Sequence, residues 1–170
     1  PIGRGKQLRN DAGDVDIETI LDLNRRVENQ YRQRYKNISI QLHIPVAFSS
    51  PRFLRENACC HCNIFNIAGI LSDGKVSYCG IGRLEKELIF GNVRNKKISE
   101  IWTTSPQLLE FRQKMPGSLE GVCGRCIHKY QCLGSCVAQT YAMKKNLYGS
   151  FSFCETAYRK GLFPKSRLIP

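Results

Sequence analysis

The most informative stretch of this sequence is CGRCIHKYQCLGSC, residues 123–136. Two residues separate Cys123 from Cys126, five more precede Cys132, and a further three precede Cys136. Thiolates at such short spacing can turn toward one metal centre, because the glycines of this stretch let the backbone bend sharply and come close. Their backbone N–H groups can then donate to the sulfides of an iron–sulfur cluster. The stretch therefore predicts a metal centre in a loop.

The other cysteines strengthen this prediction. The chain has nine cysteines, and all of them lie between Cys59 and Cys154. An odd number argues against a closed set of disulfides. The polar start of the chain also lacks the apolar segment of a signal peptide, so we expect a reducing, cytoplasmic location, where thiols more often bind metal. The five cysteines outside the stretch are Cys59, Cys60, Cys62, Cys79 and Cys154.

Zinc and iron–sulfur clusters are the two candidate metal groups. Zinc ribbons present two Cys-x2-Cys pairs to one tetrahedral ion, and here Cys123/Cys126 is a clear pair while Cys59/Cys62 is a candidate second one. The remaining spacings have no role in a ribbon, which favours iron–sulfur chemistry. A four-iron cluster needs four thiolates, so nine cysteines allow two clusters. The three histidines, among them His61 between cysteines, are interpreted as packing or surface residues.

The first fifty residues predict a helix followed by a strand. Ile17, Ile20 and Leu21 begin a series of apolar residues at helical spacing that runs to Tyr31. Apolar and polar residues then alternate over 38–44, which is typical of a strand, and a proline ends the alternation. Because a helix that leads into a strand is the repeating unit of an α/β sheet or barrel, this segment suggests part of one.

The cysteine-bearing part predicts mixed, α+β structure. Residues 70–78 read as a β-hairpin, with Asp73 and Gly74 as the positive-φ residues of a type I′ turn. Residues 98–114 read as a helix that Pro106 breaks into two, and another helix is expected from about residue 137 to 145.

Charge and hydropathy exclude other classes of protein. The formal charge is +12, with 26 Lys and Arg against 14 Asp and Glu. These basic residues are dispersed, and no nucleic-acid-binding motif accompanies them, so we expect no nucleic-acid partner. No apolar run reaches the length of a membrane span, so we expect no membrane association.

At its cysteines the sequence resembles the SPASM domain, the C-terminal part of many radical S-adenosylmethionine enzymes. Cys62 is followed after eleven residues by Gly74 and after four more by Cys79, and the later cysteines continue the spacing of that domain. The stretches FGNVR at 90–94 and ISEIW at 98–102 resemble the segment that joins its two halves. The resemblance covers roughly residues 51 to 165.

The resemblance implies two interleaved [4Fe-4S] clusters. The outer cluster would be held by Cys123, Cys126, Cys132 and Cys154. The inner one would be held by Cys62, Cys79 and Cys136, with Cys59 or Cys60 as its fourth ligand. The implied task is modification of a peptide or protein substrate, in which the clusters conduct electrons or hold the substrate, and a flavodoxin or ferredoxin would be the electron donor. A stand-alone ferredoxin-like carrier and a zinc-stabilised interaction module are the alternatives.

The resemblance also predicts the domain organisation. Residues 1–50 resemble the C-terminal end of the partial TIM-type barrel of these enzymes, and residues 51–170 form the iron–sulfur domain. The Cys-x3-Cys-x2-Cys motif that holds the catalytic cluster of the family does not occur in this sequence. We therefore predict no catalytic residues here and no activity of this chain alone, and S-adenosylmethionine would bind only through the remainder of the barrel.

Overall fold

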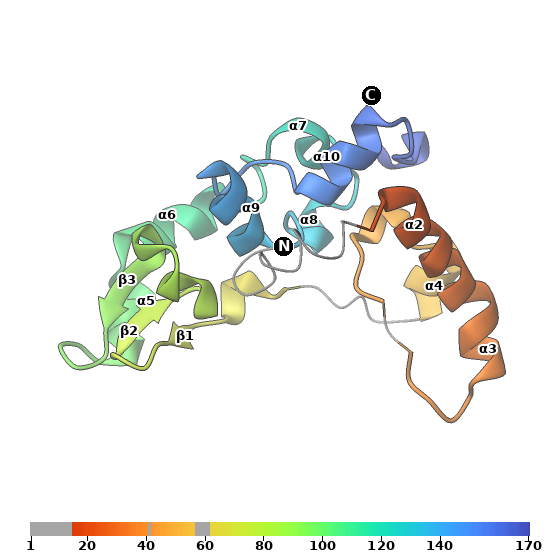
Figure 1. Cartoon of the computed structure of the whole chain (residues 1–170). Helices are drawn as coiled ribbons and strands as arrows, with labels where there is room; N and C mark the ends of the chain where they lie inside the picture. Colours follow the sequence, from red (N-terminus) through yellow and green to blue (C-terminus); the bar gives the residue numbers. More distant parts are fainter. Residues whose placement is uncertain (1–14, 41, 57–61) are drawn as a thin grey trace.

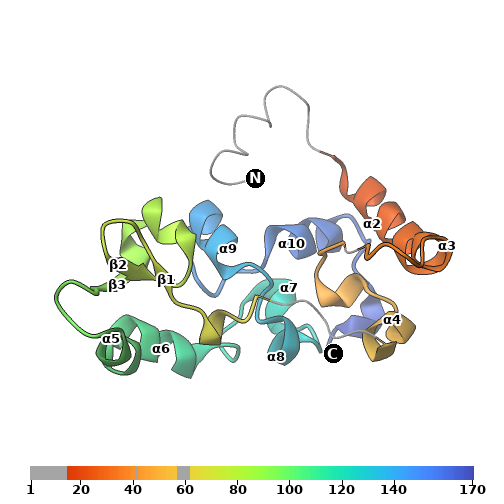
Figure 2. The same cartoon turned by 90° about the horizontal axis from the view of Figure 1, so that it is seen from below.

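The computed structural model describes residues 15–40, 42–56 and 62–170. Figures 1 and 2 show an elongated arrangement of three groups of elements. The helices between residues 17 and 56 lie at one end, and a small sheet with the helices between residues 98 and 114 lies at the other. The short helices between residues 121 and 159, together with the turns that join them, lie between these two groups and carry most of the described cysteines.

The N-terminal group begins with α2, Ile17–Arg26, which continues through a π-helical turn, Val27–Tyr31, into α3, Arg32–Arg34. The carboxylate of Asp16 caps the helix, because its Oδ1 accepts a hydrogen bond from the Thr19 N–H at 2.6 Å. The predicted helix is therefore present. A short helix, α4, spans Pro51–Glu56.

The strand predicted over residues 38–44 is wrong for the residues of that range that the structure describes. Residues 38–40 and 42–44 form no strand and lead into a 3-10 turn, Val46–Phe48. Alternating polarity marks a face for burial, but a strand also needs a neighbouring strand to accept its hydrogen bonds. Here the Ile40 carbonyl accepts a hydrogen bond from Arg32 Nε at 3.1 Å instead. The end of a TIM-type barrel predicted for residues 1–50 is thus not shown by the described residues.

The sheet has three antiparallel strands in the order β1-β2-β3. They are β1, Gly69–Ile70; β2, Lys75–Ser77; and β3, Ile89–Asn92.

The predicted hairpin is present between β1 and β2, but its turn is not of type I′. Among the residues of the loop only Gly74 has positive φ, at +83°, and its N–H donates to the Leu71 carbonyl at 2.9 Å. Asp73 keeps an ordinary φ, and its carboxylate accepts from the Lys75 N–H at 3.1 Å. The sequence places Gly74 at the one left-handed position of a three-residue loop.

Helices α5, Ile98–Thr104, and α6, Pro106–Lys114, cover one face of the sheet. Pro106 starts the second helix, which confirms the predicted break. The core between sheet and helices is almost free of water: Val76, Leu108 and Phe111 are each at most 1% exposed.

The central group contains four short helices: α7, Gly121–Gly124; α8, Lys129–Cys132; α9, Val137–Lys144; and α10, Ser152–Arg159. Helix α9 confirms the helix predicted near residues 137–145. The C-terminal tail runs back over this group, where Leu168 pairs with Cys126 in an isolated bridge. Within the described part of the chain, none of the helices has both the length and the apolar character that crossing a membrane requires.

The N-terminal group packs on α10. The Lys160 ammonium lies 2.9 Å from a carboxylate oxygen of Glu18. The Phe48 ring contacts Phe153 and Phe163 edge-on, with ring centres 5.2 and 5.3 Å apart. Edge-on aromatic pairs of this kind add to the stabilisation that burial alone gives, so residues near 48 are anchored to the central group.

Candidate metal centre

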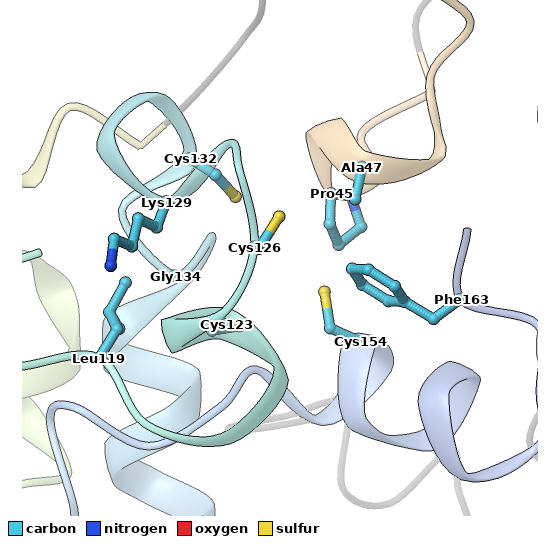
Figure 3. Close-up of a pocket in the computed structure, with 10 residues that line it drawn as sticks. All are labelled: Pro45, Ala47, Leu119, Cys123, Cys126, Lys129, Cys132, Gly134, Cys154 and Phe163. Carbon is cyan, nitrogen blue, oxygen red and sulfur yellow. The ribbon is translucent and has the colours of Figure 1, made fainter. Parts of the chain in front are cut away.

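Four cysteines from separate parts of the central group line one cavity. Cys123 comes from α7, Cys126 from the turn after it, Cys132 from the end of α8, and Cys154 from α10. Figure 3 shows the sulfur atoms of Cys126, Cys132 and Cys154 directed into a common space. Cys123, Cys126 and Cys154 are each at most 7% exposed. We refer to these four residues as the outer thiol set. The rest of the wall is formed by Pro45, Ala47, Leu119, Lys129, Gly134 and Phe163.

Glycine and left-handed backbone bring these thiols together. A Cβ at Gly124 would lie 2.1 Å from the Leu119 carbonyl oxygen, so only glycine allows the close turn between Cys123 and Cys126. Farther along, Leu133, Gly134 and Ser135 have consecutive positive φ values of 51°, 74° and 59°.

Three successive left-handed residues reverse the direction of the chain, and two of them are not glycine, which costs conformational energy. The reversal separates Cys132, which faces the outer cavity, from Cys136, which approaches a second group of thiols.

The environment of the outer set stabilises one thiolate in particular. A hydrogen bond from the Cys154 thiol lowers the pKa of Cys123 to about 7, with help from the Phe151 N–H, which lies 3.4 Å from the Cys123 sulfur. Cys154 donates that hydrogen bond and is buried, so its pKa is raised. Burial also raises the pKa of Cys126, and that of Cys132 to about 11. Since metal ligation requires thiolates, a metal bound here would displace protons from these thiols.

A second group consists of Cys62, Cys79 and Cys136, which we call the inner thiol set. Burial raises the pKa of Cys62, and the neighbouring thiols of Cys136 and Cys79 raise it further, which shows that the three lie near one another. The Gln139 N–H at the start of α9 donates to the Cys136 sulfur at 3.4 Å. All three residues are partly exposed.

The structure places the four outer thiols around one cavity, and Cys62 interacts with Cys79 and Cys136. That these two sets are the ligands of two clusters, as the resemblance implies, stays a prediction. Cys59, Cys60 and His61 lie outside the described residues, so the fourth inner ligand stays open. Sequence reasoning missed the segment around Val46, whose N–H hydrogen-bonds to the Cys132 sulfur. Nothing in the motif signals this contact, because the segment precedes the first cysteine.

The outer donor set suits an iron–sulfur cluster in its chemistry. A four-iron cluster binds one thiolate at each of its irons, and the outer set offers four thiols around one cavity. Four thiols, mainly apolar walls and a backbone N–H directed at sulfur suit that group.

Comparison with known proteins also points to iron–sulfur cluster binding. Residues 52–127 match the family model of SPASM, described as an iron–sulfur cluster-binding domain. The chain is 33% identical to an AdoMet-dependent heme synthase from Methanosarcina barkeri over 92 aligned residues. The aligned stretch covers 54% of this chain and 24% of that protein. The chain is also 33% identical over 87 residues to an AdoMet-dependent heme synthase from Oleidesulfovibrio alaskensis. That alignment covers 51% of this chain and 21% of the relative.

The chain therefore spans less than a quarter of the length of these curated relatives. No solved structure matches it significantly. The family match begins at residue 52 and ends at residue 127, so it contains Cys123 and Cys126 but not Cys132, Cys136 or Cys154. Within residues 52–127, the sequence comparison indicates an iron–sulfur cluster-binding domain.

Proposed function

We propose that this chain is the auxiliary iron–sulfur part of a radical S-adenosylmethionine enzyme and that it holds two [4Fe-4S] clusters. The observation that carries the proposal is the convergence of Cys123, Cys126, Cys132 and Cys154 on one cavity. The SPASM match and the similarity to AdoMet-dependent heme synthases support the same family of chemistry.

The residues of the outer site would hold and tune a cluster in distinct ways. The four thiolates would bind iron, and the inner thiol set would supply three ligands of the second cluster. The Phe151 N–H would donate to the Cys123 sulfur, which raises the reduction potential of a cluster bound there. Leu119, Ala47 and Phe163 would exclude water from it. The clusters themselves would supply reversible one-electron chemistry.

We further propose that the complete enzyme modifies a peptide or protein, with the clusters serving electron transfer or substrate holding. The sequence resemblance to peptide-modifying members supports this substrate class. A second candidate is a role in heme synthesis, which the names of the two relatives favour. Titration of the chain with heme as a probe separates the candidates, because saturable binding near stoichiometry favours the second and its absence favours the first.

The test of the cluster proposal is the metal content of anaerobically purified and reconstituted protein. We expect about eight irons and eight sulfides per chain, with Mössbauer spectra of two four-iron clusters. One or two zinc ions without sulfide would refute the proposal and indicate a zinc-stabilised module.

Two single variants test the grouping of the ligands. Cys123→Ala and Cys154→Ala should each lose the same cluster and about half of the iron, because each removes one of four thiolates. Cys136→Ala is the matched control, since it should remove the inner cluster and leave the spectrum of the outer one. If Cys154→Ala keeps all of its iron, the grouping is wrong.

A further inference from the structure

A groove lies beside the sheet, between the β1–β2 hairpin and two 3-10 turns that follow it, Gly80–Arg83 and Lys86–Leu88. Its volume is about 840 Å³. None of the described cysteines lines it, so it is separate from the cavity of the outer thiol set. Its wall combines apolar side chains with basic ones: Ile70, Leu71, Ile89, Arg83 and Lys86.

The outer strand of the described sheet has a free edge at this groove. That strand is β1, because the strand order is β1-β2-β3. The Leu71 N–H donates to the Lys75 carbonyl at 2.8 Å, so the backbone groups of Leu71 and of Gly69, two residues earlier, point toward β2. In an antiparallel pair such residues alternate with residues whose N–H and C=O point away from the partner. The N–H and C=O of Ile70, which is 57% exposed, therefore face the open edge.

The turns supply positive charge that the described carboxylates do not neutralise. Arg83 and Lys86 line the groove, and neither forms an ion pair within the described part of the chain. Two carboxylates belong to the same turns, but both interact elsewhere. Glu85 pairs with the Lys145 ammonium, and Glu87 interacts electrostatically with the same ammonium.

The hairpin side of the groove is electrically balanced. Asp73 is the one carboxylate among the lining residues, and its Oδ2 lies 2.7 Å from the Lys75 ammonium. The positive charges of the two turns therefore stay in excess, and they attract a negatively charged partner.

We propose that this groove binds an acidic, extended segment of another polypeptide, which adds a strand to the sheet beside β1. The backbone of the segment pairs with the N–H and C=O of Ile70, and its carboxylates lie against Arg83 and Lys86. Strand addition of this kind obtains affinity from main-chain hydrogen bonds and specificity from alternate side chains. The proposal does not depend on the proposed function, because no described thiol lines the groove.

The chemistry of the groove favours a polypeptide over a nucleic acid. A free strand edge offers an N–H and a carbonyl at the spacing of a polypeptide backbone, which carries the matching groups. Leu71 and Ile89 add apolar surface that suits aliphatic side chains better than phosphates. A second copy of β1 does not match the charge, because residues 66–72 contain no carboxylate.

The experiment is a fluorescence anisotropy titration, in which the chain is added to a labelled synthetic peptide of alternating Glu and Val residues. We expect saturable binding that weakens as salt is added. The variant Arg83→Glu/Lys86→Glu should bind at least about 10-fold more weakly at low ionic strength, because two attractive contacts become repulsive.

A matched control reverses the same number of charges elsewhere. Lys36 follows α3, which lies at the end of the molecule opposite to the sheet (Figure 1), and Lys165 belongs to the C-terminal tail; both are exposed. The variant Lys36→Glu/Lys165→Glu should change the affinity by less than about 3-fold, because salt screens charges at that range. Equal weakening in the two double variants would reduce the effect to net charge and overturn the proposal.

A further pair of variants tests the strand edge. Proline is tolerated in an edge strand where its nitrogen faces solvent, so Ile70→Pro removes the outward N–H without removing a hydrogen bond to β2. Ile70→Ala removes the same side chain and keeps the N–H, which makes it the matched control. Ile70→Pro should bind at least about 3-fold more weakly than Ile70→Ala, as expected for one lost hydrogen bond. Equal affinities would refute strand addition.

Modified peptides test the same edge on the unaltered protein, so the result does not depend on how well a variant folds. One peptide is N-methylated at every Glu and the other at every Val. Only one of the two should lose binding, because a single edge of an added strand faces β1. If both bind like the parent peptide, or if the parent peptide does not bind, the proposal is wrong and the basic residues only protect the edge from self-association. Displacement of the peptide by an equal concentration of a single-stranded oligonucleotide would also overturn it.

Discussion

Replacing Gly91 by alanine should destabilise the sheet through one close contact. Gly91 lies opposite Val76 in the central strand pair, and the side chain of Ile101 from α5 covers it. A Cβ at position 91 would stand 2.7 Å from Ile101 Cγ2 and 2.9 Å from two further atoms of that side chain. These distances are well below van der Waals contact, so either the strand or helix α5 must move.

The magnitude follows from the packing. Ile101 is 2% exposed and Val76 is completely buried, so neither neighbour can turn into solvent. Overfilling a core of this kind costs about 1–3 kcal/mol. In a chain of this size, 1 kcal/mol shifts the midpoint of thermal unfolding by about 2–4 °C. Gly91→Ala should therefore lower the midpoint by roughly 2–12 °C.

The assay is thermal unfolding of reconstituted protein at one fixed scan rate, followed by circular dichroism. Gly80→Ala is the matched control, because a Cβ there meets no atom within 4 Å. We expect this control to shift the midpoint by less than about 2 °C. The double variant Gly91→Ala/Ile101→Ala should lose at least about 1 kcal/mol less than the sum of the two single variants. Equal midpoints for Gly91→Ala and Gly80→Ala, or strict additivity in the double variant, would refute this reasoning.

Two further predictions concern contacts between the groups of elements. Phe48→Ala removes an edge-on contact with Phe163 from the segment that closes the outer cavity. An iron chelator should therefore extract the outer cluster several-fold faster from this variant than from the unaltered protein. The inner cluster should be lost at the same rate from both proteins. Lys145→Met leaves the Glu85 carboxylate, whose side chain is 10% exposed, without its ammonium partner, so the unfolding midpoint should fall clearly. The exposed pair of Lys114 provides the control, since Lys114→Met should change the midpoint little, and equal losses in the two variants would contradict this account.

Local signals predicted much of the fold. Pro106 and the residues around it gave both helices of the pair α5 and α6, because proline is tolerated at the start of a helix but not inside one. The hairpin followed from Gly74, although the type of its turn did not. A Gly at that position suits several loop lengths, and the choice depends on the register between β1 and β2, which residues outside the turn determine.

The N-terminal part shows where sequence patterns fail. The residues near Ile40 alternate as in a strand, yet no strand forms in their described part, because the described sheet lies at the far end of the molecule. Pattern alone reports which side chains prefer burial, whereas pairing depends on a partner strand. The same limit explains why Pro45 and Ala47 were not recognised as part of the cavity wall: their role arises from packing against distant residues.

The grouping of the cysteines was more predictable than their surroundings. The resemblance to the SPASM domain implied which thiols share a site, whereas spacing alone places Cys136 with Cys132. Neither gave information on the thiolate-stabilising position of Cys123, which depends on Cys154 and the Phe151 N–H about thirty residues away along the chain.

The reversal of the chain at Leu133, Gly134 and Ser135 has a consequence for how the protein is made. It interleaves the two thiol sets along the sequence, so that Cys136 of the inner set precedes Cys154 of the outer set. A ribosome working from the N-terminus therefore adds the described inner thiols first, and the outer thiol set is complete only when α10 has been made. A chain whose synthesis stops before α10 carries Cys62, Cys79 and Cys136 but lacks Cys154, so it cannot present all four outer thiols.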